Sequence, residues 1–78
     1  MIERVRVQIL SDQDYEDLIA EGYLDDECIL IVSQDRGFQS LQVELLPRKD
    51  GNSWRLEFSQ LTDLLQRCKD RLWEMRKE

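Results

Sequence analysis

The sequence predicts a single α+β domain in which two helices pack on one face of a four-stranded, mainly antiparallel sheet, in the order β-α-β-β-β-α. Three observations favour this architecture: stretches that alternate between apolar and polar residues, one continuous apolar run, and two segments whose apolar residues recur at helical spacing. The chain has 78 residues, of which 41% are apolar, and this is enough for one small core. The domain should therefore span residues 1–78.

The first two predicted elements are a strand over residues 3–10 and a helix over residues 11–22. Residues 3–10 alternate between aliphatic and polar side chains, which is the pattern of a half-buried strand. Ser11 is a residue type that caps helix N-termini, and Asp14 follows it at the spacing of an approximate capping box. Gly22 is suited to ending the helix in a left-handed conformation. The apolar face of this helix would consist of Tyr15, Leu18, Ile19 and Tyr23.

Three further strands are predicted in the middle of the chain. The continuous apolar run at residues 28–32 indicates a strand that is covered on both faces. Residues 38–46 alternate again, with Leu41, Val43 and Leu45 facing the core. The Asp50-Gly51 pair predicts a hairpin loop before a last strand at residues 53–58. The inward-facing residues of that strand would be Trp54, Leu56 and Phe58.

The second predicted helix begins after Ser59, which is a good N-cap residue, and runs almost to the end of the chain. Its apolar stripe has helical period and consists of Leu61, Leu64, Leu65, Cys68, Leu72 and Met75. Cys28 and Cys68 both fall within apolar patterns, and we interpret them as reduced core residues. The order of the strands in the sheet stays open, because the β-α-β connection can join parallel or antiparallel neighbours.

The distribution of charged and apolar residues indicates which partners the protein could bind and where in the cell we expect it. The formal net charge is -6, and residues 12–27 contain eight acidic and no basic side chains. A nucleic-acid-binding protein usually carries a positively charged surface, which this acidic chain lacks, so we expect no nucleic-acid partner. The longest apolar run is far shorter than the roughly 20 residues that a membrane span needs. The amino terminus also lacks the apolar block of a signal peptide, so we expect no membrane association and a cytoplasmic location.

The residue inventory argues against catalysis, so we expect no enzyme. The chain has no histidine, the usual general base and metal ligand, and its two cysteines cannot supply the four ligands of a structural zinc site. Asp12, Asp14 and Glu16 alternate as the first ligands of a calcium loop do, but Asp17 stands where that loop needs glycine. We therefore expect no metal and no cofactor.

The acidic segment instead suggests a binding surface. On the predicted helix, Asp14, Asp17 and Glu21 would form one ridge of like charges, and each neighbouring pair would cost about 0.2 to 0.5 kcal/mol. A surface arranged only for stability would interleave the signs of charge. Our first hypothesis is a non-catalytic module that docks a basic protein, much as small inhibitor and immunity-type proteins do. Its partner-binding residues would be Asp14, Asp17, Glu21, Asp25, Asp26 and Glu27.

A second hypothesis is self-association through the last helix. Trp73 falls outside the apolar stripe of this helix and therefore needs a cover. Trp73 and Met75 could supply a dimer contact, or Trp73 could cover the edge of the core. The acidic ridge would then serve only solubility, and the protein could be a monomer or a homodimer.

Overall fold

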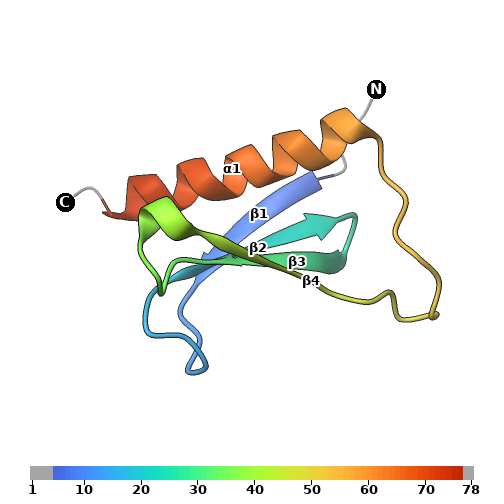
Figure 1. Ribbon diagram of the computed structural model, residues 1–78. Coiled ribbons are helices and arrows are strands. Elements are labelled where there is room, and N and C mark those ends of the chain that lie inside the picture. Colours follow the sequence, from blue (N-terminus) through green and yellow to red (C-terminus); the bar gives the residue numbers. More distant parts are fainter. Residues whose placement is uncertain (1–4, 77–78) are drawn as a thin grey trace.

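The computed structural model describes residues 5–76, which form one antiparallel sheet crossed by one long helix (Figure 1). The sheet has four strands in the order β1-β2-β3-β4, so that each strand pairs with its neighbour in the chain. The elements are β1 (Val5–Leu10), β2 (Ile19–Leu24), β3 (Glu27–Ser33), the 3-10 turn η1 (Phe38–Ser40), β4 (Gln42–Leu45) and α1 (Phe58–Arg76). The predicted α+β class and four-stranded antiparallel sheet are confirmed.

The sheet is a meander, and its register fixes which side chains share a face. Val5 lies opposite Leu24 at one end of the β1-β2 pair, and Leu10 lies opposite Ile19 at the other end. The register of β2 against β3 shifts between Gly22 and Tyr23, where the ladder contains a bulge. β1 and β4 are the two edges of the sheet.

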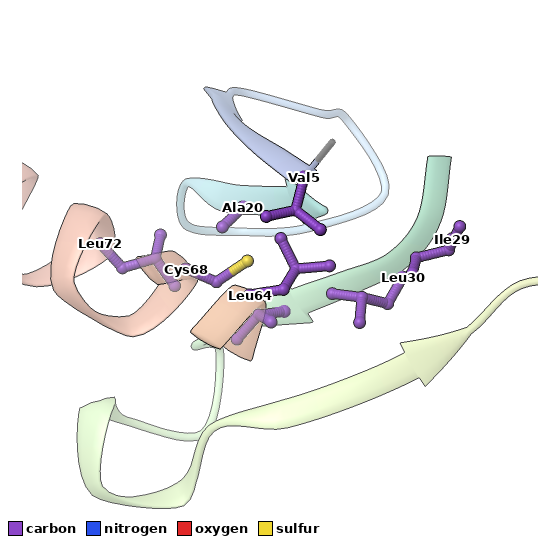
Figure 2. Close-up of a cluster of buried hydrophobic side chains, with 8 residues drawn as sticks. Val5, Ala20, Ile29, Leu30, Leu64, Cys68 and Leu72 are labelled. Carbon is purple, nitrogen blue, oxygen red and sulfur yellow. The ribbon is translucent and has the colours of Figure 1, made fainter. Parts of the chain in front are cut away.

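The core lies between the sheet and α1 (Figure 2). Every third or fourth residue of α1 turns toward the sheet, and Leu64, Cys68 and Leu72 are fully buried there. α1 packs mainly on β1 and β2 and makes fewer contacts with β3. The strand residues of the buried cluster are Val5, Ala20, Ile29, Leu30 and Val32.

The predicted helix at residues 11–22 is wrong, because residues 11–18 form a loop and residues 19–24 form β2. Local hydrogen bonds explain the loop: the carboxylate of Asp12 accepts the amide N–H of Asp14 at 2.8 Å, and that of Asp17 accepts the amide N–H of Leu18 at 3.0 Å. Such side-chain bonds compete with helical backbone bonds. Ile19 and Ala20 are adjacent in the chain and both fully buried, which a strand between two covered faces allows.

The predicted strand at residues 53–58 is also wrong. Residues 52–57 have no regular structure, and Phe58 is the first residue of α1, with 85% of its surface exposed. Trp54 and Leu56 do pack against the core, and the Trp54 indole N–H donates to the carbonyl of Leu46 at 2.8 Å. The turn at Asp50-Gly51 is confirmed, since the Gly51 amide N–H donates to the Arg48 carbonyl at 3.2 Å. The chain therefore turns here but returns to the core without joining the sheet.

Candidate protein-binding surface

The β1-β2 loop (residues 11–18) lies on the side of the sheet away from α1 (Figure 1). We call this side the far face. The Tyr15 hydroxyl reaches across the far face and donates to the carboxylate of Glu44 on β4 at 3.2 Å. Ile19 has the far-face parity, because it pairs with Leu10, and it is fully buried. The Ile19 side chain is therefore covered on the far face, next to this loop.

Carboxylates hold the backbone of this loop. The Asp35 side chain, in the turn after β3, accepts the amide N–H groups of Glu16 at 3.1 Å and Asp17 at 3.0 Å. Gln34 is 2% exposed and donates from Nε2 to the carbonyl of Leu18 at 3.0 Å. These bonds fix the loop to the end of β3, and they bring Asp35 into the acidic segment.

The result is a cluster of five carboxylates at one end of the sheet, which we call the acidic end. Within residues 5–76, the ion pairs between described residues lie elsewhere, at Arg48–Asp50, Arg67–Asp63 and Arg71–Glu74. Arg36 follows Asp35 in the chain but forms no ion pair with it in this part of the structure. The members of the acidic end are Asp12, Asp14, Glu16, Asp17 and Asp35.

The acidic end extends toward β4 through Tyr15. Burial raises the pKa of the Tyr15 hydroxyl, and the hydrogen bond to Glu44 raises it further. The negative charges of Glu44, Asp12 and Asp14 act in the same direction. Asp12 and Asp14 belong to the same turn as Tyr15, because the Tyr15 amide N–H donates to the Asp12 carbonyl at 3.0 Å.

The predicted ridge of Asp14, Asp17 and Glu21 does not exist, because these residues share no helix. Asp14 and Asp17 lie in the loop, whereas Glu21 lies on β2 and accepts a bond from the Tyr23 hydroxyl at 2.8 Å. A side-chain ridge needs the helical spacing that residues 11–22 lack.

The remaining predicted residues, Asp25, Asp26 and Glu27, lie at the opposite end of β2. Asp25 has a positive φ of 57° and starts the tight turn from β2 to β3. β2 has six residues, which corresponds to a length of roughly 17 Å, so this turn is distant from the acidic end. Partner binding by any of the six residues stays a prediction, but they cannot form one contiguous patch.

The turn at Asp25 and Asp26 lines a hollow of about 380 Å³ in which both signs of charge meet. Arg48 stacks over the Trp54 ring, 5.1 Å from its centroid, and pairs with Asp50 at 3.1 Å. The remaining lining residues are Leu24, Glu27 and Lys49. This end of the sheet is therefore electrostatically mixed, in contrast to the acidic end.

Sequence reasoning missed an open apolar surface at β4. All four residues of β4 are exposed, including Val43 at 46% and Leu45 at 71%. We expected these side chains to face the core, and they do point to the α1 side of the sheet, but one helix cannot cover four strands. The absence of a helix at residues 11–22 therefore leaves the β4 end of that face open.

A groove of about 320 Å³ runs between β4 and α1. Its floor and walls are mainly aliphatic, with polar side chains of α1 along one rim. The lining residues are Val32, Leu41, Val43, Thr62, Leu65, Gln66 and Lys69. The sequence contained one clue to this open surface. The apolar face of the predicted first helix was small, and two of its four residues were tyrosines and not aliphatic residues.

Trp73 and Met75, the predicted self-association residues, are each 47% exposed. The Trp73 ring lies against Phe38 of η1, with ring centroids 5.1 Å apart and an interplanar angle of 51°. Trp73 thus closes the end of the core at η1 with one part of its surface and presents the rest to solvent. Self-association through these residues stays a prediction.

Comparisons with known protein families, with curated proteins and with solved structures found no match to this chain. Within residues 5–76, no helix is long and apolar enough to cross a membrane. The same described residues contain no group of three or more cysteine or carboxylate side chains arranged to hold a metal ion.

Proposed function

We propose that this protein is a non-catalytic binding module that docks a basic protein partner through the acidic end. The observation that carries the proposal is the gathering of five carboxylates at one end of the sheet, without an ion pair to any of them among the described residues. Like charges so close together oppose folding, and a cationic partner would relieve that repulsion. Their field would also steer a basic protein toward this end of the molecule.

Two of the five carboxylates have no structural task that the loop requires. Asp12, Asp17 and Asp35 each accept backbone amide N–H groups, so their side chains stabilise the loop. Among residues 5–76, no donor bonds to the side chain of Asp14 or Glu16, and both residues are exposed. Asp14 and Glu16 are therefore the charges that local structure explains least and that partner binding explains best.

The test removes these two charges without disturbing the loop. The double variant Asp14→Asn/Glu16→Gln should fold normally, because it keeps the shape of both side chains and every loop bond. Immobilised wild-type protein should retain basic proteins from a lysate of the source organism, and the variant should lose them. Retention should also fall as the salt concentration rises, because salt screens exposed charges.

A matched control removes two charges from other parts of the surface. Asp26→Asn/Glu57→Gln changes the net charge by the same amount, and both residues are exposed. Proteins that bind the acidic end should stay bound to this control. If the control loses them while Asp14→Asn/Glu16→Gln retains them, the binding site includes Asp26 or Glu57 and not the acidic end, and the proposal is wrong.

A further inference from the structure

We infer that the partner adds an extended segment to the free edge of β4, as a fifth strand in which apolar and basic side chains alternate. This inference rests on the proposed function and specifies the shape of the partner. Strand addition is a common way for an exposed sheet edge to bind a peptide, with backbone bonds giving affinity and alternate side chains giving specificity. Three features of β4 support it: its backbone, its α1 side and its far face.

The backbone of β4 is available for pairing. The Leu46 amide N–H donates to the Ile29 carbonyl at 2.9 Å, and Glu44 pairs with Ile31 two residues earlier. Bonded and non-bonded pairs alternate along an antiparallel ladder, so the N–H and C=O groups of Val43 and Leu45 point away from β3. The failure of residues 53–57 to form a strand leaves this edge without a strand partner in the described part of the chain.

The edge lacks two of the features that commonly discourage pairing. Edge strands commonly carry a lysine or a proline that discourages added strands. β4 has the sequence QVEL, and Pro47 follows it at a distance of two residues. A segment of about four to six residues could therefore pair along residues 41–46 before Pro47 ends the ladder.

On the α1 side, an added strand would meet the groove. Its residues next to Val43 and Leu45 would lie over an aliphatic surface that is now open to water. Burying such side chains stabilises a complex by about 25 cal/mol for each Å² of apolar surface removed from water. The α1 side therefore selects apolar residues at every second position of the partner.

On the far face, the same strand would meet negative charge. Glu44 points to the far face, where the Tyr15 hydroxyl bonds to it, and the turn that holds Tyr15 contains Asp12 and Asp14. Lysine or arginine at the intervening positions of the partner would lie beside these carboxylates. The two faces of β4 together therefore select an alternating apolar and basic strand.

A second copy of this chain fits the edge less well. If β4 paired with its own copy, the two sheets would become continuous, and the far faces would place two sets of Glu44, Asp12 and Asp14 side by side. The net charge of -6 on each copy opposes this approach further. Charge thus favours a basic strand over a homodimer at this edge.

The test uses synthetic peptides and amide hydrogen exchange. The probe is the peptide RVRVRVRV, and its control is VVVVRRRR, which has the same composition and charge in block order. The alternating peptide should bind at least about tenfold more tightly than the block peptide, and it should slow exchange at the amides of Val43 and Leu45. The acidic alternating peptide EVEVEVEV should not bind.

Variants locate the contact. Val43→Lys/Leu45→Lys alters exposed side chains, so the fold should survive, and binding of RVRVRVRV should weaken by about tenfold or more. Phe58→Lys/Met75→Lys adds the same two charges at exposed residues of α1, and it should leave binding unchanged.

The outcomes separate the two proposals. Equal binding of RVRVRVRV and VVVVRRRR, without protection at Val43 and Leu45, would overturn the added strand and leave docking at the acidic end intact. Failure of every basic peptide to bind, together with failure of the lysate capture, would overturn both. A dimer in sedimentation with protected Val43 and Leu45 amides in the absence of peptide would show that a second copy occupies the edge.

Discussion

A Cβ atom on Gly22 would lie 2.8 Å from Cδ1 of Leu30. The same atom would lie 3.1 Å from Cδ2 of Leu64, so the sheet packs closely against α1 at Gly22. Gly22 is buried, and the Leu30 and Leu64 side chains are fully buried around it. Glycine is required here because two leucines occupy the space that a side chain would fill.

Gly22→Ala should destabilise the fold by about 1 to 3 kcal/mol, the usual cost of forcing a methyl group into a packed core. The reduced freedom of the unfolded chain would offset only about 0.4 to 1 kcal/mol of this cost. The midpoint of urea unfolding should therefore fall, with an unchanged dependence on urea concentration.

A double-mutant cycle tests the cause of this effect. Leu30→Val removes the Cδ methyl group that the new side chain would meet, so Gly22→Ala should cost less in that background than in the wild type. An equal cost in both backgrounds would show that the clash with Leu30 is not the source of the effect.

Gly22 also shows why the sequence led to the wrong element. A glycine after an amphipathic pattern predicts a helix end, but the requirement at Gly22 comes from Leu30 on the next strand and from Leu64 on α1. Tertiary contacts of this kind cannot be detected from the periodicity of the sequence. Local patterns were enough to predict β1, β3 and α1, the turn at Asp50-Gly51, and β4 as the later part of the strand expected at residues 38–46.

The candidate surface was predicted only in part, for a related reason. The acidic composition of residues 12–27 could be read directly from the sequence. The positions of Asp14 and Asp25 at opposite ends of β2 could not, because β2 formed where a helix was predicted. Asp35 joined the acidic end through long-range bonds to Glu16 and Asp17. The open edge of β4 could not be foreseen, because it depends on the absence of the predicted helix at residues 11–22 and of the predicted strand at residues 53–58.

Gln34→Met should destabilise the protein by about 1 to 3 kcal/mol, because it leaves the Leu18 carbonyl without the donor that satisfies it in a buried position. Methionine keeps most of the side-chain volume, so the effect reports the lost polar interactions of Gln34 and not a cavity. Urea unfolding measures the change, and Gln42→Met on exposed β4 should shift stability by less than about 0.5 kcal/mol. Similar losses in both variants would contradict the role assigned to Gln34.

Stability should fall at high pH because of Cys68. Burial, with a smaller contribution from Cys28, raises the pKa of the Cys68 thiol from 9.0 to about 11. The unfolded state therefore loses this proton at lower pH than the folded state, and the free energy of unfolding should decrease as the pH rises from about 9 to about 11. Below that window the thiol is protonated in both states and contributes no pH dependence.

The measurement is urea unfolding across this pH range, with Cys68→Ala as the control. Tyr15 and Tyr23 also have raised pKa values, so part of the pH dependence should persist in the control. The difference between the two proteins isolates Cys68. Parallel stability curves for the wild type and the control would refute its contribution.

Trp73 and Phe38 provide a test that separates core packing from self-association. Their rings are 5.1 Å apart and tilted by 51°, a geometry in which aromatic pairs contribute about 0.5 to 1.5 kcal/mol beyond area burial. A double-mutant cycle with Phe38→Leu and Trp73→Leu, measured by urea unfolding of dilute protein, should give a coupling energy in that range.

Sedimentation at high protein concentration tests whether the exposed surface of Trp73 forms a dimer contact. If Trp73 serves chiefly to close the core, the wild type should remain a monomer, and the coupling with Phe38 should account for the residue's effect on stability. A dimer that Trp73→Leu dissociates, together with coupling near zero, would instead assign the residue to self-association. Met75→Gln, which alters a neighbouring residue of equal exposure, should then weaken the same dimer.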